Sequence, residues 1–273
     1  MCSSPFIVMS APNGARRDKT HHPLLPMTPD EIADCAESVL REGASMLHVH
    51  VRDKSGAHSL DPKLYKEAIR AIRERVGDQL IVQITTEAGD VYTPEQQMDV
   101  VRKLRPEAVS IALREICPDP GMAKKIRDFS RWLRDNGIMV QYILHTPDDV
   151  SRFSEMRDRS VLGAESRFVL FVLGSYSMNI DGLPQDIQHY RSNLADESVS
   201  WAVCCFGRHE DKAAASAAVA AGHARVGFEN NLYGPDGTLA SDNASQIRSV
   251  AEHGRKAGRS IADADNVRAL FAC

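Results

Sequence analysis

The sequence predicts a single (β/α)8 barrel, and three observations lead to this fold class. Eight short apolar runs alternate with eight amphipathic or alanine-rich stretches along the chain. The runs are continuously apolar, as parallel strands that are buried on both faces usually are. The length of 273 residues suits such a barrel, which needs about 250 residues. A doubly wound open sheet is the alternative, but no glycine-rich phosphate-binding fingerprint follows an early strand.

The first four strand–helix units fill the first half of the chain. Strands are expected at residues 6–11, 45–51, 80–86 and 108–113, and helices at 30–40, 62–76, 93–104 and 121–136. The first helix has the clearest start, because Thr28 offers a hydroxyl cap, Pro29 fits the first turn and Glu31 stands three residues after the cap. Gly43 is expected to end this helix.

The second half repeats the pattern with weaker helices. Strands are expected at residues 138–144, 167–173, 200–206 and 224–228, and clear helices at 210–221 and 244–257. The helices that should begin near Asp148 and Asp186 have weak periodicity. We therefore expect one domain over residues 1–273, with a short C-terminal tail from about residue 260.

Composition excludes several classes of protein. The chain has 33 basic and 37 acidic residues, so no basic excess points to nucleic acid. Six cysteines without paired spacing predict reduced thiols in a cytoplasmic protein. The longest apolar runs, 168–173 and 201–206, are too short to span a bilayer, and no signal-peptide pattern is present. We expect no membrane partner.

A candidate metal site begins with His48 and His50. Residues two apart on a strand point the same way, and barrel active sites lie at the C-terminal ends of strands. Glu229 ends the neighbouring eighth strand and adds a carboxylate. Three protein ligands with an open position are typical of a catalytic metal; zinc is the first expectation, with manganese, iron or cobalt allowed. Two histidines satisfied by hydrogen bonds are the alternative.

Arg225 lies four residues before Glu229 and shares its strand face. A charged side chain is rarely buried without a partner. Arg225 is therefore either a clamp for a substrate carboxylate or developing enolate, or a structural partner of Glu229 or another acid.

Several segments together carry a resemblance to a known family. They are Asn13-Gly-Ala15, Pro26-Met-Thr-Pro29, residues 43–44 and 48–53, Arg105-Pro-Glu107, Phe171-Val-Leu-Gly174, Phe206-Gly-Arg208 and residues 222–229. On these, the chain resembles the beta-keto acid cleavage enzymes almost from end to end. The resemblance implies a tetrameric TIM barrel with a divalent metal, commonly zinc. It also implies condensation of a beta-keto acid with acetyl-CoA to acetoacetate and a new CoA thioester.

The resemblance assigns roles to individual residues. His48, His50 and Glu229 match the metal ligands, and Arg225 matches the active-site arginine. The hydroxyl positions of the active site are those of Thr85 and Ser110.

The sequence departs from the family pattern at the active site. Asn230 stands where the family has its proposed aspartate base, and an amide cannot accept a proton at neutral pH. Residues 112–114 replace an Asn-x-Gly pattern, and residues 140–143 replace Pro-Glu-x-Glu. His145, Glu87 and Glu115 follow strand ends and are the candidates for another base.

Three interpretations of the function remain open at this stage. The chain cleaves beta-keto acids with a different base; it is a metal-dependent aldolase or hydrolase acting on an anionic keto acid; or it is a barrel that binds a ligand without turnover.

The residues expected around the substrate favour an anion. Arg16 stands where the resemblance implies an acidic residue suited to an ammonium group, so a cationic substrate would be repelled. Arg208 adds positive charge, and Asn13 and Glu87 complete the expected substrate-binding set. A beta-keto dicarboxylic acid fits this pattern. Alternatively, Arg16 meets solvent or a phosphate of CoA.

Overall fold

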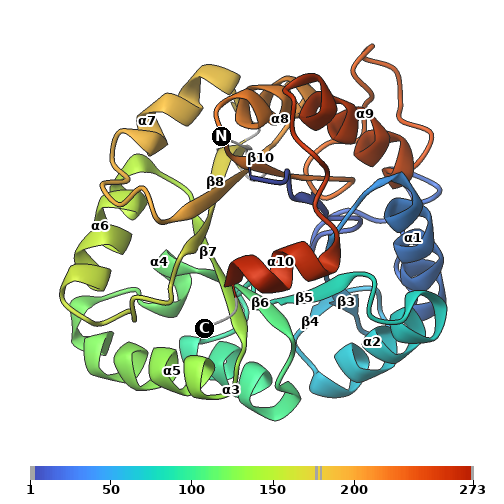
Figure 1. Cartoon of the computed structure of the whole chain (residues 1–273). Coiled ribbons are helices and arrows are strands. Elements are labelled where there is room, and N and C mark those ends of the chain that lie inside the picture. Colours follow the sequence, from blue (N-terminus) through green and yellow to red (C-terminus); the bar gives the residue numbers. More distant parts are fainter. Residues whose placement is uncertain (1–3, 176–177, 179, 272–273) are drawn as a thin grey trace.

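The computed structural model describes residues 4–175, 178 and 180–271, and over these residues the expected barrel is confirmed. Parallel strands pair in a ring, which closes because β10 pairs with both β8 and β11 (Figure 1). The barrel strands are β1 (Val8–Ser10), β2 (Met46–Val49), β5 (Ile81–Thr85), β6 (Ala108–Ala112), β7 (Met139–Leu144), β8 (Phe168–Ser175), β10 (Ser200–Cys205) and β11 (His223–Val226).

Helices surround the ring and cover its outer face (Figure 1). They are α1 (Pro29–Glu42), α2 (Pro62–Val76), α3 (Pro94–Leu104), α5 (Ala123–Asp135), α6 (Pro147–Asp158), α7 (Ile187–Arg191), α8 (Glu210–Val219) and α9 (Asn243–Lys256). The start of α1 is as expected, because Thr28 Oγ1 accepts from the Glu31 N–H and the Glu31 carboxylate accepts from the Thr28 N–H. The helix ends at Gly43, which has a φ of 107°.

Several short elements were not expected from the sequence. The second strand ends at Val49, and the chain then forms the small antiparallel pair β3 (Val51–Arg52) and β4 (His58–Ser59). β9 (Ile180–Asp181) pairs antiparallel with the end of β8. The short helix α4 (Leu113–Ile116) follows β6 directly. The weak helix near Asp186 is reduced to a 3-10 turn, Pro184–Asp186, and the five residues of α7.

The predicted C-terminal tail contains α10 (Ala264–Phe271), which lies across one end of the barrel (Figure 1). Val267 is fully buried in the apolar cluster that fills the barrel interior, together with Ile7 and Met46. Phe271 stacks on Phe168 with ring centroids 4.5 Å apart. Ile7, Met46 and Phe168 lie at or next to the beginnings of their strands. The helix α10 therefore closes the N-terminal end of the barrel and leaves the C-terminal end for the active site.

Within the described part of the chain, no helix is long and apolar enough to cross a membrane. Cys35, Cys117, Cys204 and Cys205 are free thiols, as the spacing predicted. Cys2 and Cys273 lie outside the described residues.

Candidate active site

The candidate metal ligands His48, His50 and Glu229 come together at the C-terminal end of the barrel. The Nε2 atoms of His48 and His50 are 3.0 Å apart, and each lies 3.5 Å from Glu229 Oε2. This Glu229 oxygen is buried and has no hydrogen-bond donor among the described residues. Two imidazole nitrogens and one orphaned carboxylate oxygen around one point are the donor set that a divalent metal such as zinc takes.

The surroundings prepare the two imidazoles as ligands. Gln83 Oε1 lies 2.9 Å from His48 Nδ1, so that nitrogen donates and Nε2 keeps its lone pair for a metal. Asn13 holds the backbone of His50, because its amide accepts from the His50 N–H and donates to the His50 carbonyl. Burial lowers the pKa of both imidazoles, with Arg225 contributing at His48, so both are in the neutral form that binds metal.

Glu229 is held ionised by its neighbours. Burial alone would raise its pKa, but the Arg225 guanidinium beside it outweighs burial and holds the pKa well below its usual range. Arg225 Nη2 lies 3.2 Å from Glu229 Oε1. Arg225 therefore forms the structural pair with Glu229, yet its buried Nε and Nη1 have no acceptor among the described residues. Those two donors are available to a bound anion.

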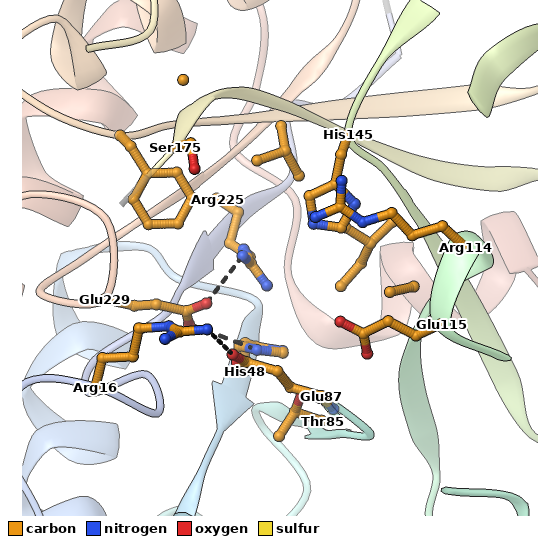
Figure 2. Close-up of a pocket in the computed structure, with 15 residues that line it drawn as sticks. Arg16, His48, Thr85, Glu87, Arg114, Glu115, His145, Ser175, Arg225 and Glu229 are labelled. Atoms are coloured by element: carbon orange, nitrogen blue, oxygen red, sulfur yellow. Dashed lines mark hydrogen bonds and ion pairs between the residues drawn. The ribbon is translucent and has the colours of Figure 1, made fainter. Parts of the chain in front are cut away.

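A cavity opens above this group and is drawn in Figure 2. Thr85, Arg16, Glu87, His145 and Arg225, which the sequence nominated, line it. Arg16 is 46% exposed at its side chain and lies 4.0 Å from Glu87, so it is in contact with both solvent and the cavity.

Other nominated residues lie outside the lining of this cavity. Ser110 is buried beneath it, with Oγ 3.5 Å from His48 Nδ1. Arg208 is exposed, and its guanidinium lies over the ring of Tyr233, 5.7 Å from the centroid. Asn230 is fully buried, and its amide donates to Glu210 Oε1 at 3.0 Å and to the Arg225 carbonyl at 3.1 Å. The roles predicted for these three residues stay predictions.

The three candidate bases differ in their electrostatics. Burial lowers the pKa of His145 to about 3, with Arg114 and Arg225 adding to the effect. Burial instead raises the pKa of both Glu87 and Glu115. Glu115 Oε2 accepts from the Ala88 N–H and from Gln97, which fixes its carboxyl at the cavity wall. The two carboxyls are therefore better proton acceptors near neutral pH than the imidazole is.

Sequence reasoning missed three residues that the site uses. Gln83 pairs in register with His48, and its signal was a polar side chain inside an apolar strand. Arg114 lines the cavity from α4, a helix that the sequence did not predict. Glu210 begins α8 and is fully buried against Asn230, a contact between distant segments for which the sequence carried no local signal.

Comparisons with known proteins show the family of the chain. The sequence model described as beta-keto acid cleavage enzyme matches residues 5–272. The chain is 30% identical to the 3-keto-5-aminohexanoate cleavage enzyme of Fusobacterium nucleatum over 272 residues, which is 97% of each chain. It is 23% identical to the 3-oxoadipate:acetyl-CoA acetyltransferase of Cupriavidus necator, over 98% of this chain and 95% of that one.

Among solved structures, the apo structure of ObcA is similar with a TM-score of 0.70 at 16% identity. The match covers 91% of this chain but only 65% of that longer chain, so this likeness supports the fold alone. The family match spans nearly the whole described barrel, including all three candidate ligands and Arg225. The chain therefore belongs to the beta-keto acid cleavage enzyme family and is an enzyme of that kind.

Proposed function

We propose that the protein condenses an anionic beta-keto acid with acetyl-CoA to give acetoacetate and a new CoA thioester, at a zinc centre held by His48, His50 and Glu229. The observation that carries the proposal is the buried, unpartnered Oε2 of Glu229, 3.5 Å from each of two imidazole nitrogens. A metal bound there would polarise the keto oxygen of the substrate and stabilise negative charge on it.

The chain's own residues supply binding and orientation. The buried Nε and Nη1 donors of Arg225 can form paired hydrogen bonds with a substrate carboxylate. Glu229 keeps Arg225 charged and in place through their 3.2 Å contact. Arg16 is half exposed at the mouth of the cavity. It is therefore suited to a phosphate of CoA rather than to the reacting end of the keto acid.

Proton abstraction from the substrate is assigned to the carboxyl pair Glu87 and Glu115. Both line the cavity, and burial raises the pKa of each. This pair replaces the aspartate whose position Asn230 occupies. Glu87 Oε2 also lies 3.8 Å from His50 Nδ1, beyond hydrogen-bond distance. Glu87→Gln and Glu115→Gln, compared by the pH profile of kcat, identify which carboxyl accepts the proton.

The test combines metal analysis with product detection. Protein purified without chelator should contain about one divalent ion per chain, and it should form acetoacetate from acetyl-CoA and a beta-keto acid. His48→Ala should lose both properties, whereas His189→Ala, which changes an exposed histidine on α7, should keep both.

Trace metal in the untreated protein, or no acetoacetate across a broad panel of beta-keto acids, would contradict the proposal. The resemblance also supports a homotetramer, which sedimentation measurements on the same preparation would check.

A further inference from the structure

We propose that Arg114 and His145 form a second anion site, which binds the far carboxylate of a beta-keto dicarboxylic acid. This inference rests on the proposed function, because the reacting end of the same acid would lie at Arg225 and the metal ligands. Both residues line the same cavity as Arg225, from α4 and from the end of β7 (Figure 2).

Arg114 is an exposed cation at the cavity wall that has no carboxylate or hydrogen-bond partner among the described residues. No carboxylate of the described residues lies within 4.0 Å of its guanidinium, and none of their oxygens accepts a hydrogen bond from it. Its sequence neighbour Glu115 is engaged elsewhere, because Oε2 accepts from Ala88 and Gln97. Figure 2 shows the Arg114 side chain reaching from α4 toward His145. An arginine in this setting is suited to a carboxylate that arrives from solution.

His145 lines the cavity wall beside Arg114. Its backbone is pinned, because its N–H donates to Asp149 Oδ2 and its carbonyl accepts from the Tyr190 hydroxyl. The buried Nδ1 has no hydrogen-bond partner among the described residues, and in the tautomer that protonates Nδ1 its N–H can donate to a ligand carboxylate. Burial is the main cause that lowers the pKa of His145, and the Arg114 and Arg225 guanidinium groups add to it.

Each of the other two arginines of the cavity has a carboxylate within 4.0 Å. Arg225 is paired with Glu229 at 3.2 Å, and Arg16 lies 4.0 Å from Glu87 at the mouth. The role that the sequence suggested for Arg16, recognition of the distal end, therefore fits Arg114 better. Apolar side chains, Ile143 and Val172, also line the cavity and suit the methylene groups between two carboxylates.

The experiment compares two substrates that differ only at the far end, 3-oxoadipate and 3-oxohexanoate. Arg114→Gln should lower kcat/KM for 3-oxoadipate by roughly 10- to 100-fold, the loss typical of one charge-assisted hydrogen-bonded pair. The same substitution should keep kcat/KM for 3-oxohexanoate within about twofold of the wild-type value. The monoacid is therefore the control for folding and for the reaction itself. Arg114→Lys, which retains the charge, should restore part of the loss.

A second measurement separates this inference from the proposed function. Adipate contains both carboxylates but no keto group, so calorimetric binding of adipate needs no turnover. Adipate should bind the wild-type protein and lose affinity in Arg114→Gln. Equal losses for both keto acids, or adipate binding unchanged by the substitution, would overturn the subsite. No acetoacetate from either acid, with Arg114-dependent adipate binding, would support the subsite and contradict the proposed function.

Discussion

At the scale of single residues, Gly14 shows how closely the first loop packs on the candidate metal ligand Glu229. Its φ of +61° lies in the left-handed region that favours glycine, so any side chain there is strained. A Cβ on Gly14 would also lie 2.6 Å from Glu229 Cγ, well inside van der Waals contact. The backbone of this loop therefore sets the position of the carboxylate.

Gly14→Ala should consequently displace Glu229 and lower the metal content and the rate of acetoacetate formation. The left-handed backbone alone costs about 1–2 kcal/mol of stability. Gly137→Ala is the matched control, because Gly137 has a φ of +65° and open space around its Cβ position. Gly14→Ala should lose more thermal stability than Gly137→Ala, because it adds the contact with Glu229 to the backbone strain, and only Gly14→Ala should lose metal. Equal metal content in the two variants would rule out the packing role of Gly14.

The residues that could be predicted from sequence are those fixed by local rules. His48 and His50 follow from the two-residue period of a strand, and Glu229 follows from the meeting of first, second and eighth strands in a barrel. The partner of Asn230 could not be predicted, because Glu210 lies on another strand–helix unit and the contact depends on tertiary packing. Arg114 was visible only as a departure from the family pattern.

At the scale of elements, Glu210 joins the beginning of α8 to β11 and α9. Its Oε1 accepts from the Gly227 N–H at 3.1 Å and from Asn230, and its Oε2 accepts from Gln246 at 3.3 Å. Burial nevertheless raises the pKa of Glu210 to about 8, although the hydrogen bonds from these donors partly oppose the effect of burial. A buried carboxyl that holds its proton near neutrality makes this junction sensitive to pH.

The stability of the fold should therefore depend on pH through Glu210. The folded protein holds the proton more tightly than the unfolded chain, whose glutamate has a pKa near 4.5. The protonated Glu210 therefore adds to the free energy of unfolding, by a few kcal/mol at most. This contribution is fully present below about pH 4.5 and is lost as pH rises through about 8. Urea unfolding measured across this pH range should show that the free energy of unfolding falls more steeply with pH in wild type than in Glu210→Gln.

The slope is the relevant quantity, because Glu210→Gln also removes an acceptor and lowers stability at every pH. Glu67→Gln, an exposed change on α2, serves as the control and should keep the wild-type slope. Identical slopes in wild type and Glu210→Gln would mean that Glu210 is ionised across the whole range.

Helix prediction succeeded where capping was explicit and failed where stability comes from packing. The hydroxyl cap of Thr28 and the left-handed Gly43 fixed the ends of α1 within two residues. The sequence predicted a tail where α10 lies. A helix this short is not stable by itself, and α10 gains its stability from packing on the barrel interior.

At the scale of the whole molecule, the barrel separates stability from chemistry. The candidate metal ligands, Arg225 and the cavity lie at the C-terminal ends of the strands, whereas α10 packs on the strand beginnings. Because the layers of apolar side chains inside the barrel lie between them, damage at one end should not reach the other directly.

Val267 on α10 tests this separation. Its side chain is fully buried, so Val267→Ala should destabilise the fold by roughly 1–3 kcal/mol and lower Tm by several degrees. Leu270→Ala, on the same helix but 37% exposed, should change stability by less than about 0.5 kcal/mol. Metal content and acetoacetate formation at 25 °C should match wild type in both variants. A loss of metal in Val267→Ala at a temperature where the fold is intact would show that the two ends are coupled through the barrel core.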